Sequence, residues 1–340
     1  MGWTDNVVRF DSVGPKGKKQ NILVTGASGY IGSHVCKELH NAGHTIVALD
    51  RNENVLHGYY DVVVQGDYAD EVLVQSIMVQ NNIDAVVHIG ATSLVGPSVS
   101  NPGTYYLNNV EGTRALLEAC RIQGVDKFVF ASSAATYGNA SGICYTSSTD
   151  LPCNPYGWTK WMTEKMLSDY HTAYGIKSVS LRYFNVAGSA HNMGQVKDAT
   201  HLIARIMESA LADTEFTVYG NTYPTDDGTC IRDYVHVSDV ARANKLALDL
   251  IEFYDDAFVF NIGSGEGNSV FDIIGAVREY TPLPTKYTIG RVRAGDPAIL
   301  ISDIENTKKV LGWYPKFGID KIVESAYNWY ISEKYTNLSK

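Results

Sequence analysis

The chain has 340 residues and a formal net charge of −9 at pH 7. This acidic balance disfavours nucleic acid and anionic membranes as partners, because either would require a basic face. Hydrophobic residues make up 45% and charged residues 19% of the chain, which is typical of a globular enzyme and excludes a disordered protein. The five cysteines are odd in number and include no C-x-x-C pair, so neither a disulfide framework nor a structural zinc site is expected.

The first residues of the chain show no recognisable targeting signal. Residues 1–20 contain no apolar run long enough for a signal peptide, and no later run approaches the length of a membrane span. A myristoylation signal would have Ser or Thr at the position of Asn6. We interpret residues 1–20 as a flexible leader and expect a cytoplasmic protein without a metal site.

From Asn21 onward, short β-branched runs alternate with longer helical segments. Strands that are apolar on both faces and separated by helices predict a doubly wound parallel sheet of the Rossmann type. We assign this domain to residues 21–186. The runs that we interpret as its strands are 22–24, 46–49, 62–64, 85–87 and 128–130.

Three helices are predicted with defined starts. Residues 30–41 follow the first strand and have a helical pattern. Asn101-Pro102 and Asn154-Pro155 predict two long helices, near 101–121 and 155–173, because Asn is a favourable cap and Pro suits the first turn.

The alternation stops after residue 186. Gly, Asn, Asp and Thr cluster in 188–200, 220–229 and 263–268, with short helices and strands between them. Open α/β sheets bind ligands at their carboxyl edge. We therefore predict that residues 187–340 mainly form a smaller, substrate-binding lobe at that edge, with segments that can return to the first domain.

A glycine-rich loop lies between the first strand and the first helix. Gly26 would permit the tight turn, Gly29 the close approach of a pyrophosphate, and Gly32 the packing of helix against strand. The spacing is G-x-x-G-x-x-G, a variant of the dinucleotide fingerprint. A glycine-rich turn without a ligand is the alternative, but the position between strand and helix favours cofactor binding.

Asp50 ends the second strand, where a carboxylate can accept a hydrogen bond from a ribose 2′-hydroxyl and repels a 2′-phosphate. This favours NAD over NADP, although the adjacent Arg51 could meet a phosphate. Asp67 and Tyr68, after the third strand, could contact the adenine or form an ordinary turn.

Tyr156 and Lys160 stand at positions i and i+4, on one face of a predicted helix. A phenol with its ordinary pKa near 10 is a poor base at neutral pH. A neighbouring ammonium and the positive nicotinamide ring would both favour the phenolate and lower that pKa. Ser133, at the end of a predicted strand, lies at the same sheet edge. We predict these three residues to be catalytic.

Together these residues resemble the extended short-chain dehydrogenase/reductases, and within them the epimerase branch. The resemblance runs from about residue 21 to about residue 330. It rests on the following motifs: VTGASGYIGSH (24–34), NNVEGT (108–113), PYGWTK (155–160), LRYFNVAG (181–188), THLI (200–203), YPTDDGTCIRDYVHV (223–237) and RAGDPAILISD (293–303).

The resemblance assigns further residues to the cofactor and the substrate. Lys160 would bind the NAD ribose, and Ser133 and Tyr156 would flank the sugar 4-hydroxyl. The other residues that would line NAD are Tyr30, Ile31, Asp50, Asp67, Tyr68, Ile89, Ser93, Asn108 and Phe184. The residues that would hold the UDP are Asn185, His201, Leu202, Thr217, Tyr219, Arg232, Arg293 and Asp296.

The resemblance implies epimerisation at C4 of a UDP-hexose, interconverting UDP-galactose and UDP-glucose through a transient 4-keto sugar, with NAD regenerated in each cycle. It also implies a homodimer formed by the helices near 101–121 and 155–173. Leu300 would face the C2 substituent of the sugar, and its intermediate size leaves UDP-N-acetylglucosamine and UDP-pentoses open as substrates.

Other functions on this fold are weaker alternatives. A 4,6-dehydratase would carry an Asp-Glu pair, and a UDP-glucuronate decarboxylase a Glu, where this chain has Ala134 and Ala135. A reductase would need NADPH, which Asp50 disfavours. A non-catalytic dinucleotide sensor would not need Tyr156 or Lys160.

Overall fold

The computed structural model describes residues 18–52, 59–149, 151–196, 200–293 and 296–338. Most of the predicted leader, residues 1–17, lies outside the described residues. Within the described ranges, no helix has both the length and the apolar character needed to cross a membrane.

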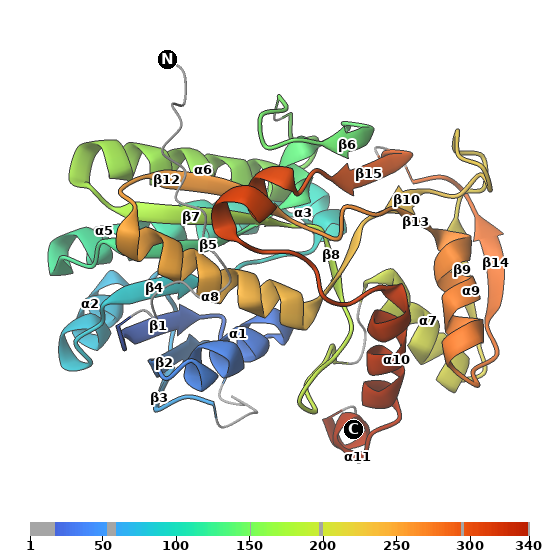
Figure 1. Ribbon diagram of the computed structural model, residues 1–340, viewed down its shortest axis with the longest axis horizontal. Coiled ribbons are helices and arrows are strands. Elements are labelled where there is room, and N and C mark those ends of the chain that lie inside the picture. Colours follow the sequence, from blue (N-terminus) through green and yellow to red (C-terminus); the bar gives the residue numbers. More distant parts are fainter. Residues whose placement is uncertain (1–17, 53–58, 150, 197–199, 294–295, 339–340) are drawn as a thin grey trace.

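A seven-stranded parallel sheet forms the centre of the larger domain, with the strand order β12-β7-β5-β4-β1-β2-β3 (Figure 1). Its central strands are buried on both faces, as the continuous apolar runs predicted. This confirms the doubly wound, Rossmann-type sheet. The strands are β1 (Asn21–Thr25), β2 (Thr45–Asp50), β3 (Val62–Gln65), β4 (Ala85–His88), β5 (Lys127–Ser133), β7 (Lys177–Tyr183) and β12 (Ala257–Ile262).

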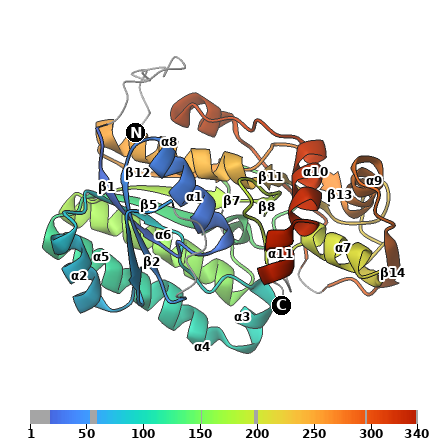
Figure 2. The ribbon, with the colours of Figure 1, turned by 90° about the horizontal axis from the view of Figure 1, so that it is seen from below.

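Helices cover both faces of the sheet (Figure 2). Alternate residues of β1 point to opposite sides, so Ile22 and Val24 belong to one buried cluster and Leu23 to the other. The first cluster is covered by α1 (Tyr30–Asn41) and α8 (Val237–Phe253). The second is covered by α2 (Glu71–Gln80), α5 (Gly112–Gln123) and α6 (Pro155–Tyr174).

The helix predicted near 101–121 is divided into three parts. It runs through α4 (Pro102–Tyr105), a π-helical segment η1 (Tyr106–Glu111) and α5. The predicted Asn101 cap is wrong. This residue follows the end of α3 (Val95–Ser100), its backbone does not have the extended conformation of a cap, and its side chain accepts no hydrogen bond from α4. Asn154 has the extended backbone of a cap, and its side chain accepts a hydrogen bond from the Gly157 amide at 2.8 Å.

The smaller lobe lies beyond one end of the central sheet (Figure 1). Its core packs around Ile206, Phe216, Ile273 and Trp329. Its helices are α7 (Leu202–Leu211), α9 (Val270–Tyr280), α10 (Ile319–Tyr330) and α11 (Glu333–Leu338). Strand β9 (Glu215–Tyr219) pairs with β14 (Lys286–Gly290).

Short strands connect the lobe to the larger domain. Strand β8 (Asn185–Ala187) pairs with β11 (Tyr234–His236). A four-stranded sheet has the order β13 (Asn268–Ser269), β10 (Ile231–Arg232), β15 (Ile299–Ser302), β6 (Gly142–Cys144). The helical turns η2 (Ala134–Tyr137) and η3 (Thr307–Leu311) follow β5 and β15. After β11 the chain returns to the central sheet as α8 and β12, and the division of the chain at residue 187 stays a prediction.

Candidate active site

The glycine-rich loop packs closely between β1 and α1. Gly26 has a φ of +68°, and a Cβ there would lie 2.6 Å from the Gly90 amide nitrogen. A Cβ on Gly32 would lie 2.0 Å from the Gly26 carbonyl oxygen. Helix α1 begins after Gly29 without a side-chain cap, so the first amides of the helix lack a side-chain acceptor. The loop thus presents a bare helix N-terminus, an arrangement suited to an anion such as pyrophosphate.

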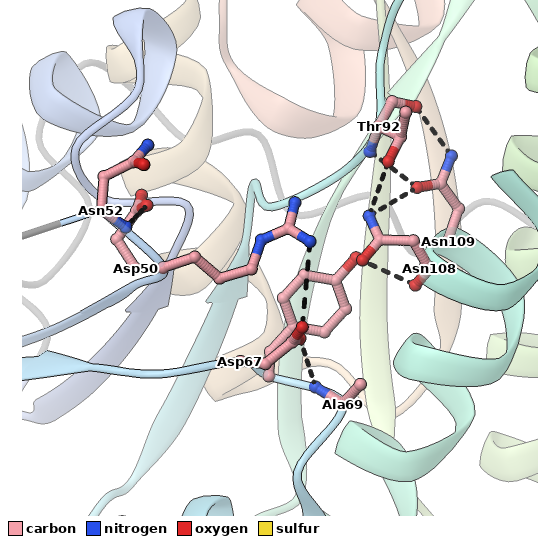
Figure 3. Close-up of polar contacts among 9 residues, drawn as sticks. Asp50, Asn52, Asp67, Ala69, Thr92, Asn108 and Asn109 are labelled. Atoms are coloured by element: carbon pink, nitrogen blue, oxygen red, sulfur yellow. Dashed lines mark hydrogen bonds and ion pairs between the residues drawn. The ribbon is translucent and has the colours of Figure 1, made fainter. Parts of the chain in front are cut away.

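Asp50 lies against this loop. One of its carboxylate oxygens accepts a hydrogen bond from the Ser28 amide at 3.0 Å, and the other accepts from the Asn52 amide at 3.0 Å. The adjacent Arg51 forms an ion pair with Asp67, with 3.8 Å between nitrogen and oxygen. Arg51 therefore has a carboxylate partner, and the carboxylate that contacts the loop is that of Asp50. Figure 3 shows Asp50 with Asn52, and Asp67 with the ion pair that it forms.

The π-helical segment η1 contacts the residues that follow β3 and β4 through Asn108. The buried Tyr68 donates a hydrogen bond to the Asn108 carbonyl at 2.9 Å, and the Asn108 amide donates to the Thr92 hydroxyl at 2.9 Å (Figure 3). A cavity of about 440 Å³ lies beside Arg51, Asp67 and Asn108. Two other predicted cofactor residues follow β4: Ile89 is partly buried and Ser93 is exposed.

Helix α6 holds Tyr156 and Lys160 on one face, next to the end of β5. The Lys160 ammonium donates to the Ala131 carbonyl at 2.7 Å and lies 5.8 Å from the centroid of the Tyr156 ring. Ser133 ends β5 and lies close enough to Tyr156 for its hydroxyl to oppose the rise in the pKa of that phenol. A Cβ on Gly157 would lie 2.5 Å from the Ala135 carbonyl oxygen, so the glycine allows α6 to approach η2 closely. The three predicted catalytic residues thus lie together.

Burial controls the protonation of this group. It raises the pKa of Tyr156 to about 12, against the opposing effect of Ser133. It lowers the pKa of Lys160 to about 7, against the opposing effect of Glu164. The lowering of the Tyr156 pKa that we expect from Lys160 and the nicotinamide ring together is therefore not reached in the chain alone. The reason is that removal from water disfavours the charged form of both groups.

The residues predicted to hold the substrate include two contacting pairs. Arg232 forms an ion pair with Asp296 at 2.9 Å, and only 13% of its side chain is exposed. The guanidinium of Arg293 lies over the Tyr219 ring, 3.8 Å from its centroid.

The other predicted substrate residues lie on several different elements. Leu300 packs with Phe184 in a small cluster around Tyr137. Asn185 begins β8 beside Asp233, whose carbonyl accepts its amide. Thr217 lies on β9, and His201 and Leu202 stand at the start of α7.

Comparison with known proteins identifies the family. The model of the NAD dependent epimerase/dehydratase family matches residues 22–263, which is most of the chain. The chain belongs to this family. A UDP-glucose 4-epimerase of Lacticaseibacillus casei is 41% identical over 321 residues, covering 91% of this chain and 96% of that protein.

Solved structures of family members superpose on the whole fold. The UDP-glucose 4-epimerase from Brucella ovis, in complex with NAD, has a TM-score of 0.87 at 36% identity and covers 92% of this chain and 98% of that one. The enzyme from Bifidobacterium longum, in complex with NAD+ and UDP, has a TM-score of 0.84 at 34% identity, with coverage of 91% and 97%.

Two polar residues around the candidate active site, Arg205 and Glu164, were not predicted from the sequence. The guanidinium of Arg205, on α7, lies 5.8 Å from the Tyr219 ring centroid and joins the pair with Arg293. Glu164 lies one turn after Lys160 and is buried. Its i+4 spacing from Lys160 was a usable signal, whereas nothing in the sequence points to Arg205. No group of three or more His, Cys, Asp or Glu capable of holding a metal occurs in the part of the chain that the structure describes.

Proposed function

We propose that this chain interconverts UDP-galactose and UDP-glucose by epimerising C4, with NAD as a resident cofactor. The observation that carries the proposal is the placement of Tyr156 and Lys160 on one face of α6, beside Ser133, at the sheet edge where the glycine-rich loop also lies. The names of the relatives support the choice of substrate.

The loop and its surroundings fit NAD. The close packing at Gly26 and Gly32 leaves backbone amides at the start of α1 for the pyrophosphate. Asp50 would accept from a ribose hydroxyl, while a 2′-phosphate would meet its negative charge. Asn108 and Tyr68 would form the wall beside the adenine half, and Lys160 would bind the second ribose. When bound, NAD supplies a reversible hydride acceptor and a positive charge on its oxidised nicotinamide ring.

The residues of the chain move the proton and orient the sugar. Tyr156, as phenolate, would accept the proton of the 4-hydroxyl and later return it, with Ser133 hydrogen bonded to the reacting oxygen. Lys160, as ammonium, would stabilise that phenolate. Because burial favours protonated Tyr156 in the chain alone, the active form requires added positive charge near the ring.

Epimerisation also requires that the sugar turn while the nucleotide stays bound. Arg232 and Arg293 would bind the diphosphate as guanidinium donors, Tyr219 would stack on the base, and Asp296 would lie beside the uridine ribose. Asn185, His201, Leu202 and Thr217 would add further contacts. With UDP held firmly and the hexose loosely, the 4-keto sugar can present its opposite face.

The turn η2 argues against the dehydratase and decarboxylase reactions. Ala134 and Ala135 occupy the positions before Tyr137, so this turn offers no carboxylate to move a proton or expel water. Because Leu300 is of intermediate size, UDP-N-acetylglucosamine and UDP-xylose are also tested as substrates.

The experiment is to incubate the purified chain with UDP-galactose, without added NAD, and to separate the nucleotide sugars by chromatography. We expect UDP-glucose to form with the wild type and not with Tyr156→Phe. If only UDP-N-acetylglucosamine or only UDP-xylose were converted, that nucleotide sugar would replace UDP-galactose as the proposed substrate. No conversion of any of the three, even with added NAD, would favour the dinucleotide sensor.

We also propose that two copies pair through α3, η1 and α6. Val99 and Leu107 are 66% and 68% exposed there, and Met162 on α6 is exposed as well. Large apolar side chains grouped on one surface are typical of an interface. Leu107→Arg should yield monomers in sedimentation, whereas Val72→Arg, on the exposed face of α2, should not. A monomeric wild type would refute the homodimer. A cytoplasmic location stays a prediction.

A further inference from the structure

Glu164 is a buried carboxylate in direct continuation of the catalytic face of α6. It stands four residues after Lys160, so the two side chains project from the same side of the helix. Glu164 is only 5% exposed, and Lys160 only 3%. A carboxylate so far removed from water needs strong partners.

Two neighbouring strands supply those partners. The Ser132 hydroxyl donates to one carboxylate oxygen of Glu164 at 2.5 Å. Arg182 donates through Nε to the same oxygen at 2.9 Å and through a terminal nitrogen to the other oxygen at 2.6 Å. Ser132 on β5 and Arg182 on β7 are cross-strand partners, so both reach Glu164 from the same place in the sheet.

The same strand also holds Lys160. Its ammonium donates to the carbonyl of Ala131, the residue before Ser132. Strand β5 therefore binds two successive turns of α6, one through a carbonyl and the next through a hydroxyl. These contacts fix how far α6 is rotated about its axis, and with it the direction of Tyr156 towards Ser133.

Among the titratable and charged groups around Lys160, Glu164 is the one that can stabilise its ammonium form. His88 on β4 is near Lys160 and is neutral, since burial lowers its pKa to about 3. Tyr105 on α4 and Tyr183 on β7 lie near Tyr156, and burial raises the pKa of both phenols. Arg182 is cationic. Of these groups, all in the part of the chain that the structure describes, Glu164 is thus the one that brings a negative charge to Lys160.

From this geometry we propose that Glu164 is a positioning residue that holds Lys160 in its ammonium form and in register with Tyr156. The inference rests on the proposed function, because it assigns Lys160 its role there. A buried ion pair often stabilises a fold no better than apolar residues of the same volume, so a role in the site accounts for the presence of Glu164 and Arg182.

The test is a direct titration of Lys160 in the purified full-length chain. Lysine labelled with ¹³C at Cε gives one NMR signal per lysine, and the Lys160 signal is the one missing in Lys160→Arg. In Glu164→Gln we expect its titration midpoint to fall by about one pH unit, the effect of losing a nearby opposite charge. The alkaline limb of the pH profile of kcat should fall with it. In Asp169→Asn, which removes an exposed carboxylate from the same helix, neither should move.

A second variant covers the case in which Glu164→Gln does not fold, since that change removes the charge of a carboxylate that accepts two hydrogen bonds from the buried Arg182. Glu164→Met/Arg182→Met removes both charges, so its reference is Arg182→Met, which keeps the carboxylate, and we expect the midpoint for Lys160 to be lower in the double variant than in that reference. An unchanged midpoint in the folded variant overturns the inference while leaving epimerisation in place. A lowered midpoint in a chain that converts no UDP-sugar supports the role of Glu164 and refutes the proposed function instead.

Discussion

Replacing Lys160 by Met removes a charge that the folded chain disfavours. Burial lowers the pKa of Lys160 from 10.5 to about 7. Between these values the unfolded chain binds a proton that the folded chain has released, so the stability of the wild type increases as the pH rises from about 7 towards 10. Below pH 7 Lys160 is protonated in both states, and burial of its charge lowers the free energy of unfolding by the full amount. Each pKa unit corresponds to about 1.4 kcal/mol, so this amount is about 4 to 5 kcal/mol.

The substitution also removes the hydrogen bond from Lys160 to Ala131, which offsets about 1 kcal/mol of the gain. We expect Lys160→Met to be more stable than the wild type by about 3 to 4 kcal/mol at pH 6. This advantage should disappear by about pH 10. The assay is denaturant unfolding followed by tryptophan fluorescence at several pH values, after removal of any bound nucleotide.

Lys165→Met provides the matched control, because it removes an exposed lysine from the same helix. The informative quantity is the difference between each variant and the wild type as a function of pH. If Lys160→Met were less stable than the wild type at pH 6, or if its advantage did not change with pH, burial would not control the protonation of Lys160.

Three further substitutions test the fold and the cofactor site. Gly32→Ala places a Cβ 2.0 Å from a backbone oxygen and should weaken NAD binding in calorimetry by tenfold or more, about 1.4 kcal/mol, whereas Gly275→Ala, with open space around it, should not. Asp50→Asn should shift the ratio of NAD to NADP affinity towards NADP, and an unchanged ratio would contradict the role given to the carboxylate. Asn261 is fully buried and bonds Tyr137 and two backbone carbonyls, so Asn261→Leu should lower the free energy of unfolding by about 3 kcal/mol in denaturant titrations; a loss below 1 kcal/mol would show that these bonds contribute little.

The sequence was sufficient for features set by local spacing. The central strands of the sheet were predicted because a buried parallel strand is a continuous apolar run. The glycine loop and the pair Tyr156 and Lys160 were predicted because three glycines and an i, i+4 spacing are visible without any tertiary contact. Asn154 was predicted as a cap for the same reason, and its side chain makes the expected bond.

Features that depend on contacts between distant segments were not predicted. Arg232 and Asp296 were expected to touch the substrate separately, and their ion pair depends on packing between segments far apart in the sequence. Asn101 has the sequence of a cap, but the end of α3 determines its backbone. The π-helical segment η1 places Asn108 against Thr92, a contact that the helical period alone does not indicate.

The predicted lowering of the Tyr156 pKa depends in part on a charge that the chain alone does not supply, and this leads to a test with the cofactor. In the chain alone, burial raises this pKa to about 12, so the phenol is protonated at neutral pH. If the positive nicotinamide ring supplies the missing charge, NAD should lower the pKa by one or more units. The measurement is the tyrosinate absorbance near 295 nm as a function of pH, taken as the difference between wild type and Tyr156→Phe, with and without NAD. An equal midpoint in both states would mean that the phenolate is formed only when the sugar binds, and Tyr156 could not be a base prepared by the cofactor.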